Sequence, residues 1–296
     1  MSIERQKADA AVKGYKKAKP ATLQWNFFIP VAILTLFVLT AIFAPLLAPY
    51  DPLETSLLIR LAPPAFASGG SSAHFLGTDS LGRDILSRVI YGSRVSLSVS
   101  LMVIIITASI GTLLGIIGGY LGGRTETFLM RLTDICLSIP AILLALLLAV
   151  TAGPGYWTVV LALSLLGWAP YARLIRGEAL HLRQADFVIQ ARIIGDSPLR
   201  IMSRHIFPNV INPLIVISSL QIGLVILLEA ALSFLGAGVP PPTASWGNMV
   251  NDGRSVIDTA WWISFFPGLA IGLVVLSGNF LGDWIRDKLD PRLRQL

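Results

Sequence analysis

Six long stretches of mostly apolar residues constrain the fold of this chain more than any other feature of its sequence. A helix needs about 20 such residues to cross the roughly 30 Å of hydrocarbon in a bilayer. Only 14% of the residues are charged, against about 25% in soluble domains. The sequence therefore predicts an all-α membrane protein with six transmembrane helices. Their approximate ranges are Phe27 to Pro49, Ser96 to Gly119, Phe128 to Ala152, Trp157 to Tyr171, Val210 to Gly236 and Ala260 to Leu281.

The distribution of lysine and arginine predicts the orientation of these spans, because cytoplasmic loops carry the excess of positive charge. With the N-terminus inside, 18 of the 23 lysines and arginines fall on the cytoplasmic side, so we expect both termini there. The net charge of +6 follows from this topology rather than from nucleic-acid binding. A basic tail before an apolar run is also typical of a secretory signal. A signal core has only about 7 to 15 apolar residues, so we expect an uncleaved first span.

The polar segments divide the chain into a basic cytoplasmic tail, residues 1–24, and a six-helix domain, residues 25–296. Inside this domain we expect an extracytoplasmic segment at about 50–93. A cytoplasmic loop is expected at about 172–208, and a second extracytoplasmic loop at about 237–259. The apolar surfaces of the spans would contact membrane lipid, and the basic tail is suited to anionic headgroups.

The first extracytoplasmic segment ends in a pattern typical of an amphipathic helix. Apolar residues recur at helical spacing from Leu81 to Ile90, with Asp84 and Arg88 between them, and Thr78 or Asp79 is placed to cap the helix. We expect this helix on the outer membrane surface or against neighbouring spans, unless its charges are simply solvated.

The second extracytoplasmic loop contains Pro240 to Pro242, which exclude regular helix there. Trp246, Trp261 and Trp262 are predicted to lie at the membrane interface. The loop either faces an extracytoplasmic partner or closes the bundle.

Two further features concern packing between the spans. Gly111, Gly115, Gly119 and Gly123 recur every fourth residue, which predicts a groove where another helix of this chain or of a second subunit can approach closely.

Charged residues within the spans are costly and face protein or water. Arg131 and Asp134 are predicted to pair locally, since they are three residues apart on one helix. Glu229 either lines a translocation path or braces the bundle.

The cytoplasmic loop combines positive charge with strong signals for local structure. We expect a helix from about Glu178 to Ile194, ended by Gly195. Asp196 or Ser197 would cap a second, short helix with Pro198 in its first turn and Pro208 at its far limit. The membrane topology alone explains why this loop contains six arginines between residues 173 and 204. It does not require the Gly-Asp-Ser-Pro corner, so we interpret the loop as a docking unit.

The segment YARLIRGEALHLRQADFVIQARIIGDSPLRIMSRHIFPN resembles the cytoplasmic loop that couples the inner-membrane permease subunits of ABC importers to their ATPase. The family pattern is Glu-Ala-Ala, three residues, Gly, nine residues and Ile-x-Leu-Pro. Ala191, Gly195 and Pro208 match it, whereas Ile189 and Gln190 stand where Glu-Ala is usual. A role for the missing glutamate therefore does not carry over.

The end of the pattern also departs from the family. His205 stands at the usual isoleucine, with Ile206 one place later, and Phe207 replaces leucine. Two other stretches, FLGTDSLGRDILSRVIYGSRVSL and EAALSFLGAGVPPPTASWGNMV, resemble the second of two unlike permeases in the dipeptide and oligopeptide branch.

The resemblance implies the six-span permease fold with cytoplasmic coupling helices, in a bacterial plasma membrane. The implied partners are a second, unlike permease, two ATPase subunits or domains that hold ATP and Mg, and an extracytoplasmic substrate-binding protein. Peptides are the expected cargo, with nickel chelates or other small solutes as the alternative. The implied ATPase-coupling residues are Ala191, Arg192, Gly195, Asp196, Ser197, Pro198, Leu199, Arg200, Arg204 and Pro208.

Other classes of function find less support in the sequence. The chain has no GxxxxGK[ST] phosphate loop, so we expect no nucleotide, cofactor or metal on this chain and no enzyme activity of its own. His74, His181 and His205 are scattered, and the single cysteine, Cys136, lies within an apolar run. An ion-translocating subunit of an energy-converting complex is a further alternative, but it would carry more charged residues in its spans.

Overall fold

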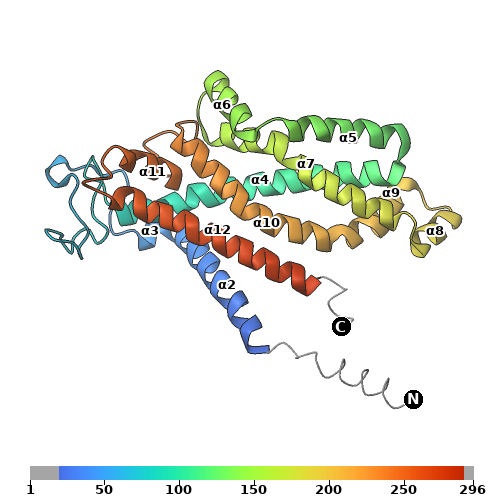
Figure 1. Ribbon diagram of the computed structural model, residues 1–296, viewed down its shortest axis with the longest axis horizontal. Helices are drawn as coiled ribbons and strands as arrows, with labels where there is room; N and C mark the ends of the chain where they lie inside the picture. Colours follow the sequence, from blue (N-terminus) through green and yellow to red (C-terminus); the bar gives the residue numbers. More distant parts are fainter. Residues whose placement is uncertain (1–19, 290–296) are drawn as a thin grey trace, which may run out of the picture.

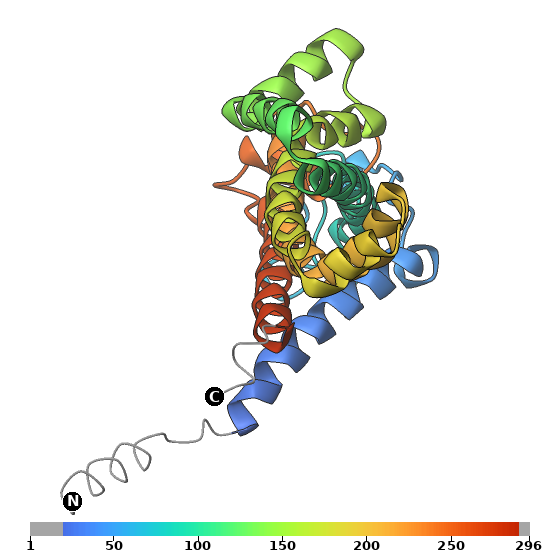
Figure 2. The ribbon, with the colours of Figure 1, turned by 90° about the vertical axis from the view of Figure 1, so that its right-hand side faces the viewer.

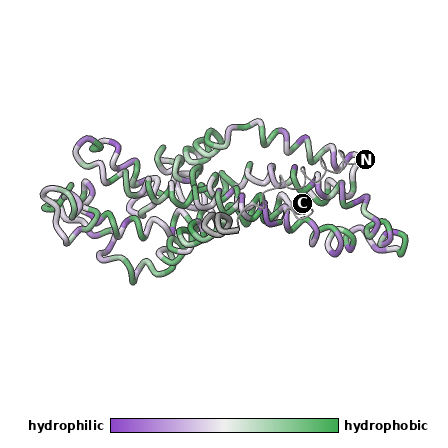
Figure 3. The backbone as a smooth tube through the Cα atoms, turned by 60° about the horizontal axis from the view of Figure 1, so that its bottom comes forward, coloured by the Kyte–Doolittle hydropathy of each residue, from purple (hydrophilic) through white to green (hydrophobic). Residues whose placement is uncertain are grey.

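The computed structural model describes residues 20–289, so most of the predicted basic tail lies outside the described residues. The molecule is an elongated helical bundle (Figure 1), and no β-strand occurs between residues 20 and 289. Figure 3 shows hydrophilic residues mainly toward the two ends and apolar residues along the middle. The all-α prediction is therefore confirmed for the described part of the chain.

Within residues 20–289, four helices are long and apolar enough to cross a membrane. They are α4 (Ile85–Leu121), α7 (Tyr156–Leu182), the continuous helix Pro198–Phe234, which includes α10 (Phe207–Phe234), and α12 (Trp262–Leu289). The first predicted span corresponds to α2 (Pro20–Ile42), a shorter apolar helix over Phe27–Ile42. In Figure 2, α2 diverges from the rest of the bundle.

The third predicted span is a broken helix. The run consists of α5 (Gly123–Ser138) and α6 (Ala141–Ala152), which meet at an angle of 80°. The physical reason is the Ile139-Pro140 pair, because a residue before proline avoids the helical region. Ile139 and Pro140 are both extended, with ψ of 124° and 118°. The third predicted span is therefore a bent pair of helices that can together count as one span.

The fourth predicted span extends beyond its expected end at Tyr171, since α7 continues to Leu182. Ion pairs to α5 lie along this extension. Arg176 donates to Glu126, and Arg173 donates to Asp134. The predicted pairing of Asp134 with Arg131 was wrong, because α5 lies beside α7 and offers Asp134 a partner on the neighbouring helix.

The predicted glycine groove is confirmed, and the helix that occupies it is α7 of the same chain. A Cβ atom at Gly111 would lie 2.5 Å from the carbonyl oxygen of Trp168, and one at Gly119 would lie 2.7 Å from that of Arg176. Only glycine lets the two backbones approach so closely. Gly123 does not belong to the groove, because α4 ends before it and it is the first residue of α5.

One end of the molecule carries α8 (Asp186–Ile193) and α9 (Pro198–Ile201) (Figure 1). The opposite end carries the cap, defined as residues 50–84 together with α11 (Trp246–Arg254). The predicted amphipathic helix is not separate from the second span, since α4 begins at Ile85 and continues to Leu121. Asp84, rather than Thr78 or Asp79, caps it and accepts a 2.8 Å hydrogen bond from the Ser87 backbone N–H.

The charges in this region are not solvated. Asp79 accepts a 2.7 Å hydrogen bond from Arg83 Nε and lies 3.3 Å from Arg88 Nη1. Both arginines also reach Asp252 of α11, at 3.5 and 3.4 Å. Asp79, Arg83 and Arg88 are buried and Asp252 is half-buried, so these four residues form a largely buried ion network between the cap and α4.

Two of the three predicted interface tryptophans lie in the protein interior. Trp246 is buried, and its indole N–H donates to the carbonyl of Val89 at 3.0 Å. Trp262 is buried as well and donates to the carbonyl of Thr78 at 3.1 Å. Only Trp261 is exposed. The first contact holds α11 against α4, and the second holds α12 against residues 50–84 of the cap.

Candidate functional site

The elbow, residues 186–206, is the strongest candidate for a functional site. It contains α8 (Asp186–Ile193), a corner at residues 194–197, α9 (Pro198–Ile201) and a π-helical turn (Met202–Ile206). It lies at the end of the molecule opposite the cap (Figure 1). The predicted helix from Glu178 to Ile194 is interrupted, because α7 ends at Leu182 and α8 begins at Asp186.

The corner has the geometry that its sequence predicts. Gly195 has a φ of +95°, the left-handed conformation that glycine adopts without strain. Ser197 caps α9, since its hydroxyl accepts from the Arg200 N–H at 3.4 Å, and Pro198 takes the first helical position. Local residues therefore determine the sharp change of direction.

Charged side chains form a second set of local contacts across the corner. Arg200 Nη1 donates to Asp196 Oδ1 at 3.0 Å, and His205 Nε2 lies 3.5 Å from Asp196 Oδ2. The hydrogen bond from Arg200 holds the pKa of the Asp196 carboxyl below its usual value. Asp196 is therefore an acceptor within the corner, whereas Ser197 is the cap.

Pro208 does not end the short helix, contrary to prediction. α9 continues through the π-helical turn into α10, so that Pro198–Phe234 forms one helix. Pro208 lies in the first turn of α10, directly after the π turn. A proline has no N–H, and in a regular α-helix its ring would clash with the preceding turn. The wider π-helical turn accommodates Pro208 for this reason. A displacement of α9 would act directly on a predicted membrane span.

The inner face of the elbow packs against the ends of α4 and α7. Buried aliphatic side chains form this contact, and the Arg192 guanidinium lies 5.8 Å from the centre of the Tyr120 ring. The cluster comprises Ile116, Tyr120, Ile175, Ala179, Val188, Ala191, Ile201, Ile206 and Val210. Ala191, which matches the family pattern of the coupling loop, therefore has a packing role, because its small side chain lies within this cluster.

The outer face of the elbow is apolar and exposed. Ile193 is 80% exposed, Ile194 is 83% exposed and Leu199 is 73% exposed. Arg200 and Arg204 lie beside Leu199 along a shallow groove. An exposed apolar patch rimmed by polar residues is typical of a protein interaction site.

Glu229 lies apart from the elbow, inside the bundle. Its side chain is fully buried, and Oε1 accepts a 2.8 Å hydrogen bond from the Ser233 hydroxyl. Its role in a translocation path stays a prediction. Sequence reasoning missed a cavity of about 170 Å³ that is lined by α4, α5, α6, α7 and α10. No local signal marks it, because its residues come from helices far apart in the sequence.

Comparison with protein families gives two matches. Residues 111–295 match the model of the binding-protein-dependent transport system inner membrane component. Residues 28–64 match the N-terminal transmembrane domain of oligopeptide transport permease C. The first match covers more than half of the chain, including the elbow.

Three curated relatives align with most of this chain. The di/tripeptide transport system permease protein of Pseudomonas aeruginosa is 43% identical and aligns over 88% of this chain and 86% of its own length. The dipeptide transport system permease protein of Escherichia coli is 44% identical over 92% of this chain and 93% of its own length. The probable D,D-dipeptide transport system permease protein of Escherichia coli is also 44% identical, over 88% of this chain and 85% of its own length.

A solved structure supports the fold. A chain of the inward-facing MetNI methionine ABC transporter superposes with a TM-score of 0.58, covering 70% of this chain and 98% of that chain, at 16% sequence identity. At this identity the likeness concerns the fold. Together with the family matches, it shows that this chain belongs to the inner membrane components of binding-protein-dependent transport systems, the permease subunits of ABC importers.

Proposed function

We propose that the elbow is the site where a separate ATPase acts on this permease, and that the cargo is a dipeptide or oligopeptide. The observation that carries this proposal is the continuity of α9 with α10 beneath an exposed apolar patch. Force applied near Leu199 is transmitted along one helix into the bundle. The names of the relatives support the peptide cargo. Nickel chelates and other small solutes are the alternative cargo.

The complete transporter, in this proposal, contains a second, unlike permease, two ATPase subunits or domains and an extracytoplasmic binding protein. ATP and Mg are held by the ATPases, so this chain contributes no catalytic residue. The elbow faces the cytoplasm of a bacterial cell and the cap faces outward, which agrees with the excess of positive charge predicted on the elbow side. Residues 1–24 and the C-terminus are then cytoplasmic.

Coupling requires that the docked elbow differ in free energy between the two states of the transporter, because contact alone shifts no equilibrium. The proposed coupling residues divide by position. Ala191 anchors the elbow by packing in the same cluster as Ile201 and Ile206, which are not coupling residues. Gly195 and Ser197 shape the elbow, and the exposed residues around Leu199 contact the ATPase.

Replacing Gly195 with valine tests the corner. A β-branched residue at a φ of +95° is strained by roughly 1 to 3 kcal/mol, and we expect substrate-stimulated ATP hydrolysis by the reconstituted complex to fall at least fivefold. Gly236→Val is a matched control at the other end of α10, because Gly236 has a φ of +79° and equally open surroundings. Unchanged stimulation in Gly195→Val, or an equal loss in both variants, would contradict a coupling role for the corner.

A further inference from the structure

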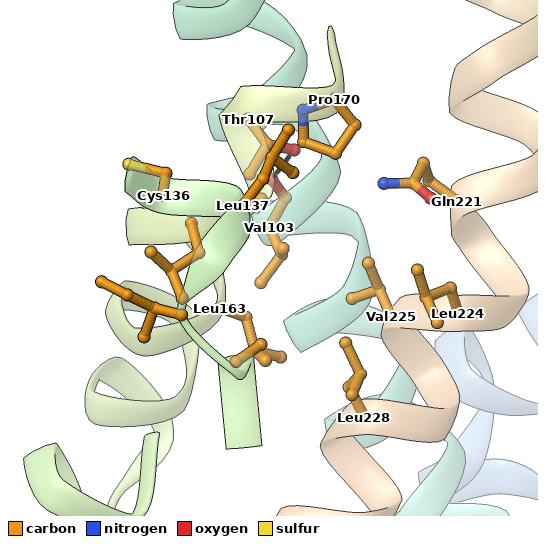
Figure 4. A pocket seen from close by; sticks show the side chains of 14 residues that line it. Val103, Thr107, Cys136, Leu137, Leu163, Pro170, Gln221, Leu224, Val225 and Leu228 are labelled. Carbon is orange, nitrogen blue, oxygen red and sulfur yellow. Dashed lines mark hydrogen bonds between the residues drawn. The ribbon is translucent and has the colours of Figure 1, made fainter. Parts of the chain in front are cut away.

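The cavity of about 170 Å³ lies between α10 and the break that separates α5 from α6. Its walls are mostly apolar, and none of the lining residues is charged. Figure 4 shows the Gln221 side chain reaching from α10 toward Pro170 and Leu137 across this space. The cavity is therefore an apolar site with one side-chain amide directed into it.

The Gln221 amide has unused hydrogen-bonding capacity. Within residues 20–289 the side-chain amide of Gln221 makes no hydrogen bond. Thr107, the other lining residue with a strong polar group, already donates to the carbonyl of Val103 at 2.7 Å. An amide provides two donors and an acceptor. A partner at this position can therefore gain hydrogen bonds without breaking any in the protein.

Regular helical hydrogen bonding breaks off at two places beside the cavity. Pro170 lies inside α7 and has no N–H, so the carbonyl of Leu166, one turn earlier, receives no bond from it. The last carbonyls of α5 have no partner within the helix, because α5 ends at Ser138. Both Leu166 and Leu137 line the cavity. The helical hydrogen bonding is therefore interrupted at two residues that line the cavity.

We propose that this cavity lies on the translocation path and that Gln221 hydrogen-bonds the backbone amide group of the peptide in transit. A peptide group has one N–H donor and one carbonyl acceptor, and a carboxamide matches both. The Gln221 amide would recognise the group that all peptides share, and apolar walls without charge would select for no particular charged side chain. The inference rests on the peptide cargo proposed above and adds a specific contact to it.

A comparison of amide and ester cargo tests this contact. We would measure uptake of a dipeptide and of its depsipeptide analogue, in which an ester oxygen replaces the N–H, by vesicles that contain the complete importer. Wild type and Gln221→Met use the same binding protein, so any change in the amide-to-ester ratio arises in the permease. Loss of one hydrogen bond of about 0.5 to 1.5 kcal/mol predicts that the ratio falls about threefold in Gln221→Met. Leu227→Met, an exposed position on α10 outside the cavity, should leave the ratio unchanged.

The chain's single cysteine provides a second measurement, because Cys136 lines the same cavity (Figure 4). We expect a water-soluble thiol reagent to modify Cys136 in the wild-type importer, and transported dipeptide to slow this modification at least threefold. Modification that is independent of peptide, or a Cys136 that never reacts because a partner subunit fills the cavity, would overturn the inference.

The outcomes separate the two proposals. Wild-type vesicles that take up no peptide would overturn the proposed cargo, and the Gln221 contact with it. Normal wild-type uptake, together with an amide-to-ester ratio that Gln221→Met does not change, would overturn the Gln221 contact alone.

Discussion

The cap is held together by residues far apart in the sequence, whereas the elbow is shaped by residues that are close neighbours. At the cap, Arg88 of α4 reaches Asp252 of α11, and Trp246 of α11 donates to the carbonyl of Val89 in α4. In the elbow, Ser197 and Asp196 both bind Arg200. The cap directs these polar groups inward. The elbow obtains its shape from local contacts that do not involve the side chains of Ile193, Ile194 or Leu199, so these exposed apolar side chains stay available to a partner.

This difference predicts where a substitution acts. A change inside the cap removes contacts among several elements, so it should alter the stability of the whole chain. A change on the outer face of the elbow removes little from the folded chain, so it should alter the coupling to the ATPase. The following variants test this division.

Arg88→Met should have the largest effect. The substitution keeps much of the side-chain volume but leaves the carboxylates of Asp79 and Asp252 with one guanidinium instead of two. Breaking a buried ion pair in this way costs about 3 to 5 kcal/mol. We expect a clearly lower thermal unfolding temperature in detergent. Arg94→Met is the control, since Arg94 lies on the same helix but is exposed. An unfolding temperature equal to that of wild type would show that the ion network does not hold the cap.

Leu199→Asp should leave the unfolding temperature unchanged and weaken coupling. Leu199 is exposed, so its loss costs the free chain little, but a carboxylate is poorly accommodated in a docked apolar contact. We expect substrate-stimulated ATP hydrolysis to fall about tenfold, the equivalent of about 1.4 kcal/mol. Leu58→Asp is the matched control on the cap, where Leu58 is 98% exposed. Equal losses of stimulation in the two variants would argue against a specific role for the elbow.

Ser197→Ala should have the smallest effect. Loss of a helix cap costs about 1 kcal/mol, and at the elbow this loss should remain local. We expect faster hydrogen exchange of the α9 amides without a change in unfolding temperature. Ser245 caps α11 and is fully buried, so Ser245→Ala should lower the unfolding temperature. Global destabilisation by Ser197→Ala would show that the two ends do not differ in this respect.

The elbow was largely predictable because its geometry depends on neighbouring residues. Gly195, Ser197 and Pro198 occupy the conformations that their types favour. Pro208 misled the prediction, since a proline after a π-helical turn lies in the first turn of the next helix. The π-helical turn has no sequence signature from which it could be predicted.

The cap was predicted poorly because its contacts are long-range. The spacing from Leu81 to Ile90 indicated a helix, but nothing nearby indicates that Arg88 pairs with Asp252, 164 residues away. The same limit applies to Trp246 and to the cavity near Gln221. An interface tryptophan and a buried one have the same local pattern, and only the packing of α4, α10 and α11 distinguishes them.

The most direct measurement is a crosslink from the outer face of the elbow in the working importer. With Leu199→Cys in a Cys136→Ser background, a short thiol-to-amine crosslinker should join this chain to the ATPase. We expect the yield to change when ATP binds, because the docked elbow has to differ between the two states. Import-competent particles in which Leu199→Cys never reaches an ATPase, with or without nucleotide, would contradict the proposal that this elbow couples ATP hydrolysis to transport.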